Sequence, residues 1–181
     1  SMVYMLLGTG FEETEAIAPL DILRRAGVDV LTVGINGKTV YGGHGIGIQA
    51  DILLEEMDLT ALEMIIVPGG LGGVKSVSAS QQALDALAFA YENDKYVAAI
   101  CAGPTILAKL GITDGKQATC YPGCEGDLFG AEYTAVPVEE DGNIITGCGP
   151  GASFDFGFAI VERLCGKDMV ATLRSQMQFR G

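Results

Sequence analysis

The chain has 181 residues, which fits one domain, and its hydrophobic fraction of 49% is enough for a packed core. Its 23 acidic and 11 basic side chains give a net charge of −12, which repels phosphate backbones and anionic lipids. No apolar run approaches the roughly 20 residues that cross a bilayer, so we expect a soluble protein with no nucleic-acid or membrane partner.

Apolar runs alternate with amphipathic segments along the first half of the chain. The helical spacing of Ala16, Ile17, Leu20 and Leu23, closed by Gly27, predicts the first helix. A turn at residues 35–38 leads into two short alternating segments, which predict a small antiparallel excursion. The predicted elements are a strand at 3–8, a helix at 12–26, a strand at 28–33, short strands at 39–41 and 46–48, a strand at 64–67 and, after a loop, a helix at 80–93.

The second half repeats this alternation. The predicted elements are a strand at 96–100, a short helix at 105–110, an irregular glycine-rich segment at 120–132, strands at 134–138 and 143–146, a helix from 149 to 164 and a final helix at 168–179. The strands are apolar throughout rather than on alternate residues. This pattern predicts an α/β fold with a mainly parallel sheet covered by helices on both faces.

The start of the chain and the cysteines indicate the compartment. The N-terminal segment lacks the features of a signal peptide, so we expect a cytoplasmic protein. Ser1 before Met2 is typical of a residue left by a cloning vector, which puts the expected single domain at residues 2–181. The five cysteines are an odd number in a chain large enough to fold without disulfides, and we expect free thiols.

Cys101 is the feature of the sequence that points most directly to chemistry. Ligands of such sheets gather beyond the carboxyl ends of the strands, and Cys101 lies where a buried strand turns into a helix. Free N–H groups and the helix dipole favour a thiolate there, so we expect its pKa to be lowered from about 8.5. On spacing alone, a buried apolar filler is an equal alternative. Neither GxGxxG nor GK[ST] is present, so no nucleotide site is expected.

Several segments resemble one known family. Residues 98–105, Ala-Ala-Ile-Cys-Ala-Gly-Pro-Thr, resemble the nucleophile elbow of the ThiJ/PfpI superfamily, which is class I glutamine amidotransferase-like. Residues 10–15, 24–27, 67–70 and 149–154 resemble, in the same order, the branch that contains the Parkinson-associated protein. The resemblance implies a flavodoxin-like three-layer sandwich, a homodimer, and cofactor-free glyoxalase III or deglycase chemistry, with redox sensing and chaperone roles also associated with this branch.

The resemblance also implies roles for individual residues. Cys101 would be the nucleophile, and Glu15 would hydrogen-bond its sulfur and move protons. The backbone amides of Gly70 and Ala102 would hold an oxyanion. A thiolate could then add to an aldehyde carbon while the amides stabilise the alkoxide. Without the resemblance, Glu15 would be interpreted as a solvated carboxylate at a helix N-terminus.

The chain departs from the family at two positions. Tyr121 stands where the members best known for glyoxalase activity have histidine, and Ala102 stands where the amidase and protease relatives have one. Tyrosine, with a pKa near 10, is a poorer base at neutral pH than imidazole. The only histidine, His44, lies in a Gly-Gly-His-Gly loop, either near a dimer interface or simply exposed.

Two further residues have a functional and a structural interpretation. Arg25 either binds an anion near the dimer interface or complements the dipole of the first helix. Cys120 either resolves an oxidised Cys101 or is an inert thiol. Cys120 and Cys124 have a C-x₃-C spacing, but no second ligand pair exists, so no metal site is predicted.

Three functional hypotheses follow. The first is an enzyme acting on a small aldehyde or glycated substrate, with Cys101 and Glu15 as its catalytic residues and no cofactor. The second is a redox sensor or stress chaperone that uses Cys101 oxidation without turnover. The third, an amidase or peptidase, lacks a histidine partner for the cysteine.

Overall fold

The computed structural model describes residues 1–181, and its centre is a seven-stranded sheet in the order β10-β11-β7-β6-β1-β2-β5. Neighbouring strands run parallel, apart from the antiparallel pair β10–β11. The strands are β1 (Met2–Leu7), β2 (Val30–Gly34), β5 (Ile52–Leu53), β6 (Leu62–Val67), β7 (Tyr96–Ile100), β10 (Val138–Asp141) and β11 (Ile144–Gly147). The mainly parallel sheet expected from the sequence is confirmed.

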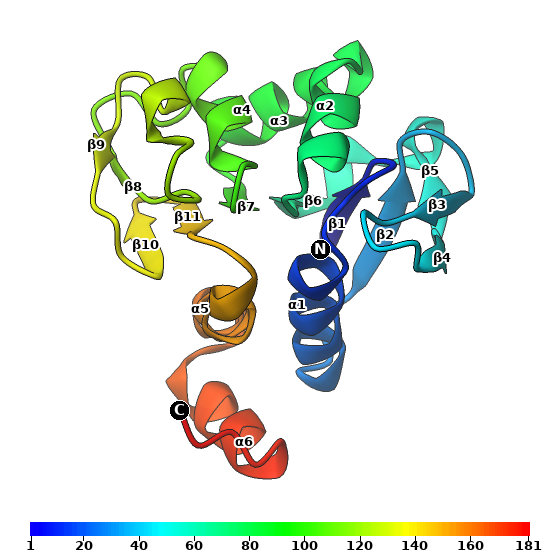
Figure 1. Ribbon diagram of the computed structural model, residues 1–181. Helices are drawn as coiled ribbons and strands as arrows, with labels where there is room; N and C mark the ends of the chain where they lie inside the picture. Colours follow the sequence, from blue (N-terminus) through cyan, green and yellow to red (C-terminus); the bar gives the residue numbers. More distant parts are fainter.

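Helices cover both faces of this sheet (Figure 1). One layer consists of α1 (Glu13–Arg25), α5 (Ser153–Cys165) and α6 (Lys167–Gln176). The other consists of α2 (Leu71–Ser78), α3 (Gln81–Glu92) and α4 (Pro104–Lys109). The expected three-layer α/β sandwich is therefore confirmed. None of these helices combines the length and the apolar composition that a membrane-spanning helix needs.

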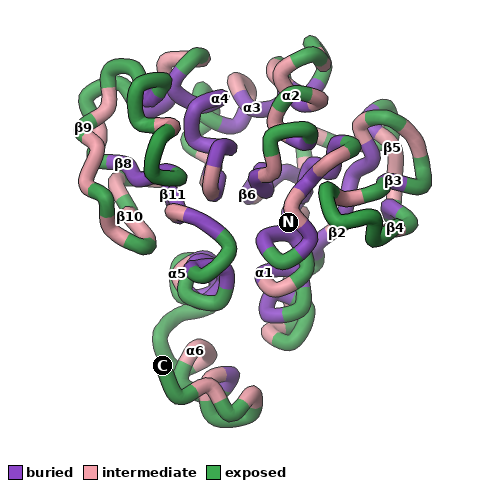
Figure 2. The backbone as a smooth tube through the Cα atoms, viewed as in Figure 1, coloured by how far each residue is buried: buried purple, intermediate pink, exposed green.

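Successive residues of each central strand enter different hydrophobic cores. In β1, Val3 and Met5 pack with α1 and α5, whereas Tyr4 and Leu6 pack with α2 and α3 on the opposite face. Figure 2 shows this as buried backbone along the central strands, with exposed segments around them. Burial on both faces explains why the strands are apolar throughout.

Helix α2 was missed by the sequence analysis, which placed a loop before residue 80. Gly72 and Gly73 are poor helix formers and conceal the helix in the local pattern. Tertiary packing requires a small residue here, because a Cβ at Gly73 would lie 2.7 Å from Phe11 Cα. The glycines thus let α2 contact the loop that follows β1.

The predicted strand at 134–138 is also wrong over most of its length. A two-stranded sheet of β8 (Gln117–Ala118) and β9 (Glu132–Tyr133) precedes it, and β10 begins only at Val138. Ala135 has a φ of 57° and Pro137 has no N–H to donate, so neither residue continues a ladder. The excursion predicted after β2 is confirmed as the antiparallel pair β3 (Thr39–Tyr41) and β4 (Gly47–Gln49).

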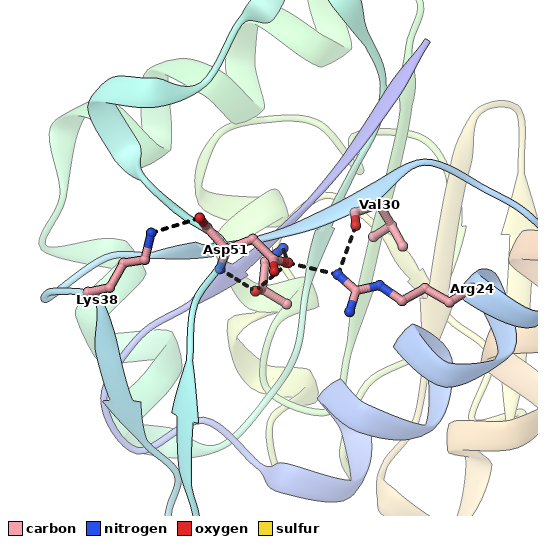
Figure 3. A network of polar contacts seen from close by, with 5 residues as sticks. Arg24, Val30, Lys38 and Asp51 are labelled. Atoms are coloured by element: carbon pink, nitrogen blue, oxygen red, sulfur yellow. Dashed lines mark hydrogen bonds and ion pairs between the residues drawn. The ribbon is translucent and has the colours of Figure 1, made fainter.

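Asp51 joins α1 to the edge of the sheet (Figure 3). Its Oδ2 accepts hydrogen bonds from Thr32 N at 2.9 Å, Thr32 Oγ1 at 2.9 Å and Arg24 Nη2 at 2.8 Å. Its backbone oxygen accepts one from Lys38 Nζ at 2.8 Å. Burial opposes ionisation of Asp51, but the bonds from Thr32 and the Arg24 charge outweigh it and lower its pKa. This network also gives Arg24 a specific structural role.

Candidate functional site

Cys101 forms a sharp corner between β7 and α4. Its φ is 67°, a left-handed conformation that is costly for a residue with a side chain. Backbone hydrogen bonds hold the corner on both sides, from Cys101 N to Gly147 O and from Tyr121 N to Cys101 O, each at 2.9 Å. The strain is therefore imposed by the surrounding structure, which is typical of functional positions.

The Cys101 corner opens into a cavity of about 440 Å³. Its lining comes from loops that lie far apart in the sequence and meet beyond the carboxyl ends of β1, β6 and β7, where open α/β sheets bind ligands. The lining residues are Glu12, Gly70, Leu71, Cys101, Ala102, Tyr121 and Cys124.

Glu15 lies beside Cys101 in the interior. It is fully buried in the first turn of α1, so its interpretation as a solvated carboxylate is wrong. Its Oε1 accepts a hydrogen bond from Gly69 N at 2.9 Å, and its Oε2 has no hydrogen-bond partner. Gly69 is required there, because a Cβ on it would collide with both Cys101 Cβ and Glu15 Oε1.

The electrostatics of this pair differ from the sequence expectation. Burial raises the pKa of Glu15 to about 7. A hydrogen bond with the Cys101 thiol lowers this pKa, and the negative charge of Glu12 raises it further. Burial also raises the pKa of Cys101 to about 12, and the negative charge of Glu15 adds to the rise. The expected lowering of the Cys101 pKa is therefore wrong. Two adjacent negative charges are unfavourable, so near pH 7 the pair gives up one proton and retains the other.

Two backbone amides from separate loops act on the Cys101 sulfur. The N–H groups of Gly70 and Ala102 lower the pKa of the thiol, but burial raises it by more. Gly70 has a φ of 89°, and a Cβ there would lie 2.5 Å from Gly10 O. The structure thus brings together all four residues for which the resemblance implied a catalytic role.

Tyr121 forms one wall of the cavity, and its side chain is 49% exposed. A second cavity of about 350 Å³ lies on its other side, lined also by Cys148 and Asp155. A Cβ at Gly149 would lie 3.2 Å from Tyr121 Cδ1, so the ring packs closely over that glycine. No histidine lines either cavity.

His44 lies next to the site rather than in it. Its backbone N and ring Nδ1 bond to the two oxygens of Glu13 at 2.7 and 2.8 Å, and its ring is 3.6 Å from Glu12 Oε1. The hydrogen bond to Glu13 raises the pKa of His44. The side-chain atoms of Glu12, Glu13 and His44 that could bind a metal ion lie within 4.8 Å of one another. The Glu13 carboxylate, however, already accepts hydrogen bonds from His44 and from Ile46 N.

Arg25 is not brought to the cavity. It forms an exposed ion pair with Asp21 at 2.9 Å in the last turn of α1. Arg25 lies ten positions after Glu15, which corresponds to about 15 Å along the helix.

The sequence analysis considered Cys120 as a thiol that either resolves an oxidised Cys101 or is inert, whereas the structure places Cys124 in the cavity lining. Cys120 is fully buried, and its Sγ lies 3.6 Å from Tyr121 O. Glu12 was also missed; it lines the cavity and caps α1 by accepting a bond from Glu15 N at 2.9 Å. Glutamate is not among the preferred N-cap residues, so the local sequence did not indicate this cap.

Comparisons with known proteins identify relatives across the chain. A model of the DJ-1/PfpI family matches residues 1–163. Protein dj-1beta of Drosophila melanogaster is 38% identical over 92% of this chain and 90% of its own length. Its crystal structure aligns with a TM-score of 0.95 and 34% identity, covering 100% of this chain and 99% of that one. The Parkinson disease protein 7 homolog of Danio rerio is 35% identical over 96% of this chain and 94% of its own length. A protein named as a deglycase from Pyrococcus abyssi is 30% identical over 82% of this chain and 90% of its own length.

Proposed function

Because this chain belongs to the DJ-1/PfpI family, we propose that it is a cofactor-independent enzyme of the glyoxalase III or deglycase type, acting on small reactive carbonyls. The observation that carries the proposal is that Cys101, strained at a φ of 67°, lies beside the buried carboxyl group of Glu15 and interacts with it. The relative named as a deglycase supports the same class of chemistry.

The raised pKa values favour general-base activation over a standing thiolate. A base whose pKa lies near 7 is well matched to proton transfer at neutral pH, and Glu15 meets this condition. Its carboxylate takes the proton of the Cys101 thiol as the sulfur bonds to the aldehyde carbon. The amides of Gly70 and Ala102 stabilise the alkoxide that forms, and Glu15 then returns its proton to that oxygen to give a hemithioacetal.

For methylglyoxal, the remaining steps need only Glu15 and water. Glu15 removes the proton from the carbon bonded to sulfur and delivers it to the neighbouring carbon through an enediol. This transfer converts the hemithioacetal into a lactoyl thioester. Hydrolysis of the thioester releases lactate and restores the Cys101 thiol, so that one methylglyoxal and one water give one lactate.

The cavity suits a substrate of this kind. A volume of about 440 Å³ accepts a molecule of a few carbon atoms, and the 79% exposed Leu71 stands at its lip. The Tyr121 hydroxyl can donate a hydrogen bond to a substrate oxygen but is a poor base at neutral pH. We therefore expect slower turnover than in relatives that have histidine at this position.

We further propose a cytoplasmic homodimer of one domain per chain. The proposed interface includes α1 and the loop that carries His44. Exposed apolar side chains on this face support it, and Ile17, Ile46 and Phe154 line one groove there.

Lactate production from methylglyoxal tests the proposed activity. Cys101→Ser should lower kcat/KM by about 10³-fold or more, because the serine hydroxyl is a far poorer nucleophile. Cys165→Ser is the matched control, since Cys165 is exposed at the end of α5 and lies outside the cavity. Lactate formation by Cys101→Ser at the wild-type rate would refute the proposal.

A redox sensor without turnover is the second candidate. It is favoured by Tyr121, which lacks the basicity of histidine, and by the second thiol in the cavity lining. Its signature is selective oxidation of Cys101 by peroxide in a protein that produces no lactate. An amidase or peptidase is not proposed, since no histidine lines the cavity.

A further inference from the structure

Two of the five cysteines share the cavity. Cys101 and Cys124 both line it, whereas Cys148 lines the neighbouring cavity and Cys165 is exposed on α5. We propose that Cys124 is the resolving thiol of Cys101, forming an intramolecular disulfide with it after a hydroperoxide has oxidised Cys101. The inference requires the thiol reactivity in the proposed function but not carbonyl turnover.

The turn that carries Cys124 is attached directly to the Cys101 corner. Tyr121 N donates to Cys101 O, and Cys124 N donates to Tyr121 O, each at 2.9 Å. Two consecutive backbone hydrogen bonds thus connect the two cysteines. A disulfide requires its Cα atoms to be about 4.4–6.8 Å apart. Gly123 precedes Cys124, and Gly126 follows it by two residues. A Cβ added to either glycine would have no neighbouring atom within 4 Å, so the turn has room to adjust.

Cys120, for which the sequence left open either this role or that of an inert thiol, is less suited to it. It has no exposed surface and packs in a small core with Ala118 and Leu128, away from the cavity lining. Burial raises the pKa of Cys120, and Cys124, which packs against the edge of the same core, adds to the rise. Cys124 therefore stands between the buried thiol and the cavity that a peroxide enters.

The chemistry balances with one hydroperoxide. The Cys101 thiol takes the terminal oxygen of ROOH, giving sulfenic acid and ROH. The Cys124 sulfur then attacks the Cys101 sulfur, the S–O bond breaks, and the oxygen leaves as water. Glu15, with a pKa of about 7, can supply the proton that the leaving oxygen needs. Cys124 releases its own proton to solvent, and Glu15 is reprotonated from solvent, so that the protons balance. An external dithiol restores both thiols.

The test is peptide mapping under non-reducing conditions after graded hydrogen peroxide, in a Cys165→Ser background that prevents cross-links through the exposed thiol. The background protein should lose two hydrogen atoms and yield a peptide pair joined through Cys101 and Cys124. Adding Cys124→Ser should instead give sulfinic acid on Cys101, and the dithiothreitol-recoverable fraction of the Cys101 thiol should fall at least about fivefold. The matched variant Cys120→Ala should behave like the background.

A Cys101–Cys120 link would overturn the proposal, as would unchanged recovery in Cys124→Ser. Lactate assays on the same proteins separate this inference from the proposed function. A disulfide without lactate production would reject only the enzyme. Lactate production without the disulfide would reject only the resolving role of Cys124.

Discussion

Cys101 is held in a left-handed conformation that costs about 1–3 kcal/mol, and burial keeps its thiol protonated at neutral pH. Burial and the neighbouring Glu15 charge thus disfavour a standing thiolate. Its reactivity must therefore depend on the neighbouring carboxyl group, whose pKa is near neutrality. The pair of Cys101 and Glu15, rather than the cysteine alone, is the chemical unit.

Replacing Glu15 by Gln should change how stability depends on pH. The folded-state pKa of Glu15, about 7, lies above its ordinary 4.5, so its stabilising contribution is complete below pH 4.5 and is lost as pH rises through 7. Wild type should lose up to about 3 kcal/mol relative to Glu15→Gln over this range. Urea unfolding at pH 4.5, 6 and 8 measures the difference.

Glu92→Gln provides the control for the Glu15 experiment, because it removes one carboxyl group from an exposed position at the end of α3. The free energy of unfolding of Glu92→Gln should depend on pH in the same way as that of wild type. If Glu15→Gln also parallels wild type, the carboxyl group is not held protonated in the folded protein.

At the scale of elements, local patterns predicted what local forces determine. Helices α1, α3, α5 and α6 have amphipathic repeats, and the buried strands have continuous apolar runs. Helix α2 and the start of β10 depend on distant contacts and on backbone conformation at Gly73 and Ala135, which no periodic pattern records. Those elements were missed for that reason.

The same distinction applies to the site. The motif around Cys101 and its resemblance to a known family predicted which residues would meet. The burial of Glu15 and its bond to Gly69, 54 residues away, determine the pKa values, and they follow only from the assembled fold. The place of Cys124 in the cavity lining likewise depends on how the irregular segment after β8 folds back onto the Cys101 corner.

Asp51→Asn should loosen the attachment of α1 to β2 and β5. The change removes the charge that bonds Thr32 and Arg24, and because the carboxylate is partly exposed we expect a loss of about 1–2 kcal/mol. The folded pKa of Asp51 is lowered, so its contribution is present above its ordinary value of 3.8 and is lost as pH falls through the lowered pKa. The free energies of unfolding in urea should therefore differ between wild type and Asp51→Asn at pH 7 and converge in acid.

Asp21→Asn is the matched control for Asp51. Its ion pair with Arg25 is exposed on both sides, and such pairs contribute less than about 1 kcal/mol. Equal destabilisation by the two substitutions would mean that the Asp51 network has no special role in joining these elements.

At the scale of the whole molecule, one face combines exposed apolar side chains with a connection to the site. Ile17, Ile46 and Phe154 are 40%, 55% and 41% exposed and line a groove of about 550 Å³ together with Glu13. Glu13 binds His44, and the adjacent Glu12 lines the Cys101 cavity. A second copy covering this face would bury the His44 loop next to the site.

Ile17→Glu should therefore convert the proposed dimer into a monomer. The net charge of −12 opposes association, so the apolar face must supply the attraction, and a further negative charge at its centre would be desolvated without a partner. Sedimentation velocity at micromolar concentration should show a dimer for wild type and a monomer for Ile17→Glu. Phe129→Glu, which alters an exposed aromatic residue outside the groove, should remain dimeric. A monomeric wild type would rule out the dimer, and a dimeric Ile17→Glu would move the interface to another face.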